Sequence, residues 1–129
     1  MAQFPWSTKI PVEADRVYVV MASRLPLKRF RSVPGFLSAT SAIRHQLADT
    51  AGLVGYALLA ELGAKTFWTF SAWEDRARLD AFARSEPHAR VIGSLAAKMG
   101  PTRFSFSEAP GSRLPWSWQD VKSALDAAR

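Results

Sequence analysis

The stretch Leu53–Trp73, LVGYALLAELGAKTFWTFSAW, decides the fold. Two runs of aliphatic, β-branched and aromatic residues flank a short turn, LGA at 62–64, and this pattern predicts a β-hairpin. The second run carries Phe67 and Trp68 at adjacent positions, which point to opposite faces of a strand. We therefore expect the hairpin to lie in a sheet that is apolar on both faces.

The segments on either side of the hairpin add one strand and one helical region each. Before the hairpin the sequence predicts a strand at Arg16–Arg24 and a helix at Ser32–Ala48. After it we expect helical structure between Glu74 and Met99, then a strand at Thr102–Ser107. The order β-α-β-β-α-β is that of the ferredoxin-like fold, an α+β fold with a four-stranded antiparallel sheet and helices on one face.

The whole chain, residues 1–129, is predicted to form a single domain. Residues 1–15 contain two prolines and no hydrophobic period, so we expect an N-terminal arm. Residues 111–129 are predicted to form a C-terminal tail with a last helix. Two helices on one face would leave the other apolar sheet face bare. A second copy packed sheet against sheet is the simplest cover, which predicts a homodimeric α+β barrel.

Composition excludes several classes of protein. The chain has no cysteine, which excludes disulfides and thiol catalysis, and its two histidines argue against a structural zinc site. No apolar run approaches the ~20 residues of a membrane span, and the start shows no signal-peptide pattern, so a cytoplasmic protein is expected. Net charge is +6, with a cluster at Arg24–Arg31. We interpret it as a solvated basic loop and predict no nucleic-acid partner, with an anionic-ligand rim and a nucleic-acid contact as alternatives.

His88 is the candidate catalytic residue. It shares one helical stripe with Val91, Ile92 and Leu95, so its ring should point toward the sheet. An imidazole on an apolar face can act as a ligand or a base, and the alternative is a half-buried histidine that bonds a backbone group. His45 lies on the other side of its own helix and is expected to be solvated.

Three segments carry a family resemblance: TFWTFSAWED at 66–75, AFARSEPHAR at 81–90, and the pair Arg103 and Phe104. They resemble the C-terminal half of spheroidene monooxygenase-like proteins and the small dimeric α/β-barrel proteins near the antibiotic-biosynthesis monooxygenases. The close match lies within Lys65–Ser107, about a third of the chain. The spheroidene monooxygenase-like relatives are haem-dependent and share the Pro-His pair, which implies haem as a cofactor and His88 as the axial ligand of its iron.

The resemblance also implies a cofactor-free alternative, in which relatives use an Asn on a strand, a Trp on the second helix, and a His or Tyr. This chain has no Asn, and Phe82 stands where that Trp is expected. The residues fit only part of that pattern.

The function hypothesis is a monooxygenase-like oxidoreductase, with haem as its implied cofactor, that acts on a hydrophobic or aromatic small molecule. The pocket is expected between helices and sheet, with Arg24 and Arg103 binding acidic groups such as haem propionates. Its expected lining is Phe36, Thr40, Trp68, Phe70, Phe82 and His88. The alternative hypothesis is a non-catalytic dimeric barrel that binds a small apolar ligand, so the residues leave open whether the protein is an enzyme.

Overall fold

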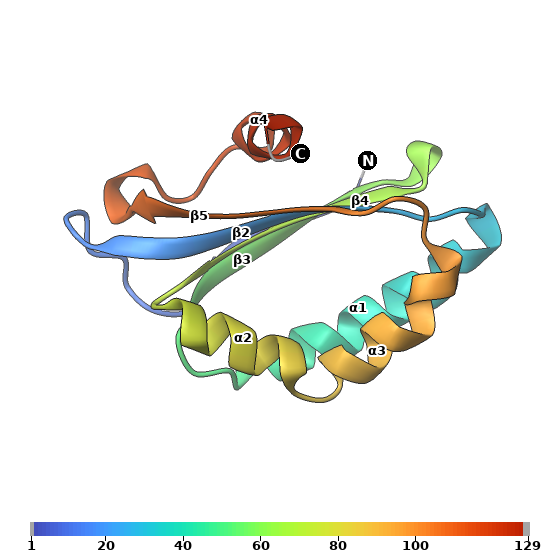
Figure 1. Cartoon of the computed structure of the whole chain (residues 1–129), viewed down its shortest axis with the longest axis horizontal. Coiled ribbons are helices and arrows are strands. Elements are labelled where there is room, and N and C mark those ends of the chain that lie inside the picture. Colours follow the sequence, from blue (N-terminus) through green and yellow to red (C-terminus); the bar gives the residue numbers. More distant parts are fainter. Residues whose placement is uncertain (1, 128–129) are drawn as a thin grey trace.

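The structure is a computed structural model that describes residues 2–127. A five-stranded antiparallel sheet in the order β1-β3-β4-β2-β5 separates three helices on one face from a fourth helix on the other (Figure 1). The strands are β1 (Ala2–Thr8), β2 (Val17–Pro26), β3 (Leu53–Glu61), β4 (Thr66–Trp73) and β5 (Arg103–Pro110). The helices are α1 (Val33–Ala48), α2 (Arg76–Arg84), α3 (His88–Leu95) and α4 (Trp118–Ala127). Among these residues no helix combines the length and apolarity that crossing a bilayer requires.

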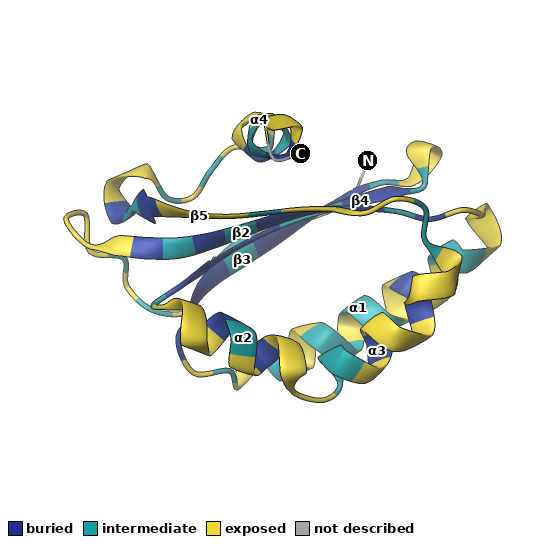
Figure 2. Ribbon diagram, viewed as in Figure 1, coloured by how far each residue is buried: buried dark blue, intermediate teal, exposed yellow. Residues whose placement is uncertain are grey.

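The predicted hairpin and the β-α-β-β-α-β order are confirmed. Strands β3 and β4 pair antiparallel around the one-turn helix η2 (Leu62–Ala64), with Leu58 opposite Thr69. The chain leaves η2 through Lys65, whose φ of 54° lies in the left-handed region. Strand β2 lies between β4 and β5 and pairs with both. Strands β2 and β4 are thus internal, and most of their side chains are buried (Figure 2).

The predicted N-terminal arm contains a strand, so the expected count of four strands is wrong. Strand β1 pairs antiparallel with β3 along the edge of the sheet, with an irregularity between Phe4 and Ser7. The sequence prediction was misled by the proline at position 5 and by the lack of a hydrophobic period. An edge strand tolerates such a proline. The ring of Trp6 lies directly on Gly55 of β3, where a Cβ atom would clash with it.

The outer face of the sheet, opposite α1–α3, is covered by the chain itself. Helix α4 packs on β2 and β5, and its Val121 and Leu125 are 0% and 1% exposed. The preceding Trp116 stacks on Phe70 of β4 with ring centroids 5.0 Å apart. The expectation of a bare face is therefore wrong, because the apolar stripe of the tail helix packs back onto the sheet. A second copy is not needed to cover this face, and the homodimer stays a prediction.

Docking of α4 can be tested at Leu125. We expect Leu125→Ala to lower the free energy of unfolding by about 2–5 kcal/mol, because the buried side chain leaves a cavity against the sheet. Ser123→Ala on the exposed side of the same helix is the control and should change stability little. Urea denaturation measures both variants. Equal stability of Leu125→Ala and the parent chain would show that α4 does not pack on the sheet.

Candidate functional site

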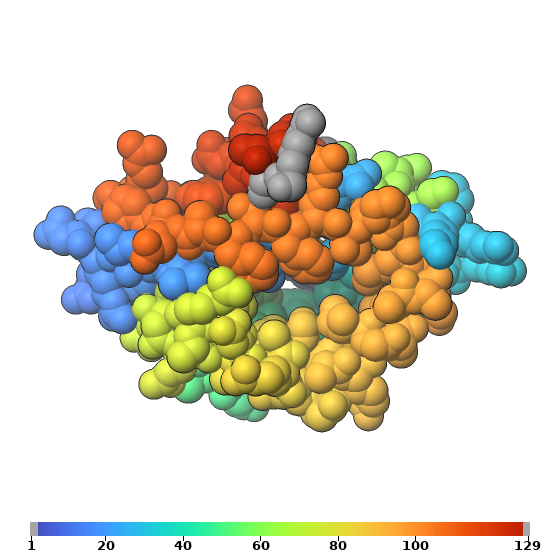
Figure 3. All heavy atoms as spheres, viewed as in Figure 1, coloured from blue at the N-terminus to red at the C-terminus, as the bar shows by residue number. Residues whose placement is uncertain are grey.

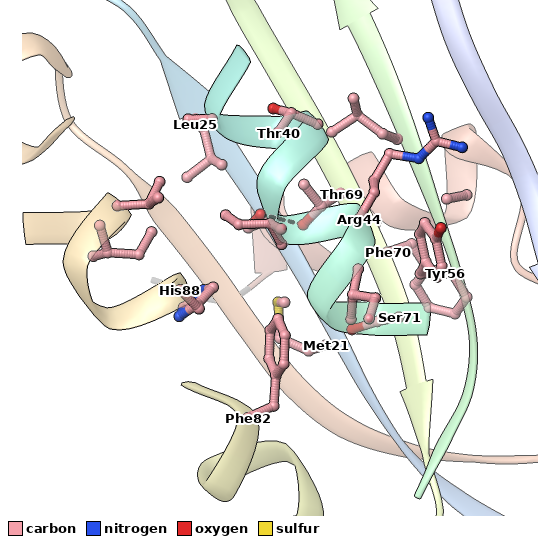
Figure 4. Close-up of a pocket in the computed structure, with 18 of the residues that line it drawn as sticks. Met21, Leu25, Thr40, Arg44, Tyr56, Thr69, Phe70, Ser71, Phe82 and His88 are labelled. Carbon is pink, nitrogen blue, oxygen red and sulfur yellow. Dashed lines mark hydrogen bonds between the residues drawn. The ribbon is translucent and has the colours of Figure 1, made fainter. Parts of the chain in front are cut away.

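A cavity of about 150 Å³ lies between the sheet and helices α1, α2 and α3. Figure 4 shows His88 of α3 and Phe82 of α2 on one side of this space and Arg44 and Tyr56 on the other. The walls are almost entirely aliphatic and aromatic. They are formed chiefly by Met21, Leu25, Phe36, Thr40, Ile43, Leu47, Tyr56, Leu58, Trp73, Phe82, His88, Val91, Leu95, Met99 and Phe104.

The period of each element decides which side chains reach the cavity. Odd-numbered residues of β2 and β4 face the helices, so Met21, Ser23 and Thr69 contribute to the floor. On α1 the residues Phe36 and Thr40 are one turn apart and face the same way. The lining of the cavity therefore follows from the two-residue period of the strands and the roughly 3.6-residue period of the helix, which turn these side chains toward each other.

The serine and threonine hydroxyl groups in the cavity wall already have partners. Ser23 Oγ and Thr69 Oγ1 form a short hydrogen bond across the β2–β4 pair. Trp73 Nε1 donates to Ser71 Oγ at 2.9 Å, and Thr40 Oγ1 donates to the Phe36 carbonyl oxygen at 2.9 Å. Among the described residues that are not exposed, no buried side-chain nitrogen or oxygen lacks a hydrogen-bond partner. Because these serine and threonine hydroxyls are satisfied, the part of the cavity that they border is suited to apolar molecules.

His88 is held in a defined orientation at the cavity wall. Its Nδ1 lies 3.0 Å from the Ala83 carbonyl oxygen, and its ring packs on Phe82 with centroids 4.8 Å apart. The backbone N–H of His88 donates to Gln46 Oε1 at 3.0 Å. A carbonyl oxygen only accepts hydrogen bonds, so Nδ1 donates, and in the neutral ring Nε2 keeps its lone pair.

The structure brings together only some of the predicted site residues. Phe36, Thr40, Phe82 and His88 line the cavity; Phe70 borders it, although its ring packs on the outer face against Trp116.

The other three predicted residues, Arg24, Trp68 and Arg103, lie outside the cavity. Even-numbered residues of β2 and β4 face α4, so Arg24 and Trp68 project from the outer face, with the Arg24 guanidinium group 5.7 Å from the Trp68 ring centroid. Arg103 lies opposite Arg24 on β5 and forms an ion pair with Asp126 of α4 at 3.6 Å.

Sequence reasoning missed several residues of the cavity, including Arg44, Tyr56 and Phe104. Arg44 follows Thr40 by one turn of α1, and this helical spacing was a usable signal. Its guanidinium group stacks on Phe4 of the unpredicted strand β1, 4.1 Å from the ring centroid. Phe104 lines the cavity from edge strand β5 and is 48% exposed, so it marks the mouth of the cavity. Figure 3 shows a hollow between β5 and the helices. No local pattern could reveal this mouth, because it lies between elements distant in sequence.

Haem does not fit this site. The cavity of about 150 Å³ is smaller than the roughly 300–1,000 Å³ of pockets that hold drug-sized ligands. Arg24 and Arg103, expected beside haem propionates, lie on the opposite face of the sheet from His88. For a metal ion without haem, the described residues offer no cluster of three or more His, Asp or Glu side chains.

No family model matches the chain, and no curated protein matches it. Solved structures do. An antibiotic biosynthesis monooxygenase has a TM-score of 0.64 at 16% identity, covering 70% of this chain and 97% of that one. The fold is that of the antibiotic biosynthesis monooxygenase structures.

Two further structures share this fold. Rv0793 from Mycobacterium tuberculosis has a TM-score of 0.64 at 16% identity, covering 72% of this chain and 94% of that one. SnoaB, a cofactor-independent oxygenase from Streptomyces nogalater solved as a mutant, has a TM-score of 0.55 at 16% identity, covering 71% and 92%. The ferredoxin-like α+β fold and the resemblance to this family of barrel proteins are confirmed, while the resemblance to spheroidene monooxygenase-like proteins stays a prediction.

The hydroxyl pair in the cavity floor can be tested by a double-mutant cycle. We expect Ser23→Ala alone to cost about 1–3 kcal/mol of stability, because it leaves the Thr69 hydroxyl beside apolar walls without its partner. Adding Thr69→Val removes that second hydroxyl and should recover much of the loss. Thermal denaturation of the single and double variants measures the coupling. Strictly additive losses would mean that the two hydroxyls do not depend on each other.

Proposed function

We propose that this protein binds a small hydrophobic or aromatic molecule in the cavity and acts on it as a monooxygenase without haem. The observation that carries the proposal is an apolar cavity with one oriented histidine in its wall. A volume of about 150 Å³ matches an engineered cavity of that size that takes up benzene, so the ligand is about one aromatic ring in size inside the cavity. Larger ligands would extend through the mouth beside Phe104.

His88 has the chemistry of a general base toward a phenolic ligand. Its Nδ1 is occupied by the Ala83 carbonyl oxygen, and Nε2 keeps the lone pair that accepts a proton. Removal of the hydroxyl proton converts a phenol into an electron-rich phenolate. The contact with Phe82 and the backbone bond to Gln46 keep the ring in place for this transfer.

The proposed reaction uses molecular oxygen and electrons supplied by the substrate itself. A methylene carbon conjugated with the phenolate loses two hydrogens and gains one oxygen atom as a carbonyl group. The second oxygen atom leaves with those two hydrogens as water, so four electrons pass from the carbon to O₂. The likeness in fold to SnoaB, a cofactor-independent oxygenase, supports a reaction of this class.

A second candidate function is binding without catalysis. It is favoured by the absence of Asn from the chain and by Phe82 at the position where the resembling oxygenases carry Trp. The commitment of the serine and threonine hydroxyls of the cavity to internal partners favours it as well. Oxygen uptake separates this candidate from the enzyme.

The role of His88 is testable with phenol and its methyl ether, anisole, as probes. We expect the parent protein to bind phenol more tightly than anisole, and His88→Ala to abolish the preference, a change of about fivefold to tenfold for one hydrogen bond. His45→Ala is the matched control, because His45 Nδ1 also bonds a backbone carbonyl, that of Ser41, but is exposed and lies outside the cavity. NMR titration measures all three proteins.

Three results distinguish the outcomes of this test. The enzyme is supported if the parent protein binds both probes and takes up oxygen with phenols that carry a conjugated methylene group. His88→Ala should then lose the oxygen uptake. Binding by the parent protein without oxygen uptake on any such phenol supports the non-catalytic candidate. Failure of both probes to bind contradicts a ligand cavity altogether.

The homodimer is part of this proposal. Phe104 and Phe106 remain about half exposed on edge strand β5 and offer apolar surface to a second copy. We expect sedimentation velocity at micromolar concentration to show a dimer, and Phe106→Ser, which lies outside the cavity wall, to weaken it. A single monomeric boundary for the parent chain would contradict the homodimer.

A further inference from the structure

One end of the molecule gathers positive charge around two exposed apolar side chains. We call this surface the basic end and define it by three segments. They are the loop and one-turn helix after β2, the hairpin tip η2 with Lys65, and the turn before β5. Its side chains are Lys28, Arg29, Phe30, Arg31, Leu62, Lys65 and Lys98. Figure 1 shows the three segments at the same end of the sheet, and Figure 3 shows the first of them projecting there.

Backbone hydrogen bonds tie these segments into one surface. Leu27 N–H donates to the Lys65 carbonyl oxygen at 2.7 Å, and Lys28 N–H donates to the Lys98 carbonyl oxygen at 3.0 Å. The Lys65 ammonium group lies 5.0 Å from the centroid of the Phe30 ring and 3.5 Å from the Lys28 carbonyl oxygen. The position of the cations is therefore set by the fold and not by a flexible loop alone.

The charge of the basic end is uncompensated within these segments. Residues 26–35, 62–65 and 96–100 carry five Lys or Arg and no Asp or Glu. None of the five forms a salt bridge with any residue of the described chain. Between them Phe30 is 60% exposed and Leu62 is 39% exposed. Without a partner these two apolar side chains are exposed to water, which costs free energy.

We propose that the basic end is a docking surface for anionic lipid membranes. Cationic side chains within a Debye length of an anionic leaflet are attracted to it, and the effect grows with each Lys or Arg. Phe30 and Leu62 enter the boundary between headgroups and acyl chains, as the apolar faces of peripheral membrane proteins do. Two signals, charge and inserted apolar area, together give stable but reversible attachment.

Lipid fits this surface better than nucleic acid. Binding of single-stranded nucleic acid uses aromatic rings that stack on bases along a groove that follows the phosphates. Here the cations surround a protruding end of the molecule, and one of the two apolar side chains, Leu62, is aliphatic and cannot stack. The docking surface stands independently of the cavity and of the reaction proposed for it.

Flotation of the full chain with lipid vesicles tests the proposal. We expect binding to vesicles containing about one-third phosphatidylserine at roughly 0.15 M salt, and little binding to pure phosphatidylcholine. The double variant Arg29→Glu and Arg31→Glu should lose at least tenfold in affinity. Its control is Arg84→Glu with Arg113→Glu, which changes the net charge equally at exposed positions outside the basic end.

The apolar part is tested separately. We expect Phe30→Ser with Leu62→Ser to bind several-fold more weakly, whereas Val17→Ser, a residue 54% exposed and outside the basic end, should bind as the parent does. Equal loss in the Arg29/Arg31 variant and its charge control would show attraction by net charge alone and would overturn the proposal. Failure of the parent chain to float with anionic vesicles would overturn it too. So would a preference for a single-stranded oligonucleotide over these vesicles at the same salt.

Discussion

The central constraint on this structure is that two internal strands of the sheet, β2 and β4, are apolar on both faces. Strands β2 and β4 place Tyr18, Val20 and Phe70 toward one side and Phe67 and Trp73 toward the other, all at most 1% exposed. Each face must be removed from water, because apolar surface of this extent is costly to hydrate. The helices on both sides follow from this requirement, and so does the position of the cavity.

The two faces are covered in different ways, and only one of them leaves space for a ligand. On the outer face Trp6, Trp116 and α4 pack on the strands and form one continuous core. On the inner face α1, α2 and α3 meet the sheet in two separate clusters of buried residues. The cavity is walled by residues of both clusters, for example Phe36 and Trp73. A site between helices and sheet is thus a consequence of how the inner face is covered.

Charge is distributed according to the same layering. Two ion pairs at the surface, Arg103 with Asp126 and Lys122 with Glu61, join α4 to the sheet and help to hold it over the outer face. Exposed pairs of this kind contribute little stability each, so the buried side chains of α4 dominate its docking. The cations of the basic end have no such role in the fold, which leaves them available for a partner.

The sequence by itself determined the hairpin, the order of elements and the helical stripe that carries His88, because these depend on local periodicity and turn residues. It also supplied Phe36, Thr40 and Phe82, whose helical spacing points them inward.

Only the tertiary structure decided which face of the sheet each strand residue lies on. Arg24, Trp68 and Arg103 lie on the face opposite the cavity. Tertiary structure also decided the place of β1, which is an edge strand because it forms hydrogen bonds with β3. It decided the place of α4 too, because the apolar stripe of this helix could pack on its own sheet or on a partner. Pairing and docking join residues far apart in the chain, and no local pattern encodes them.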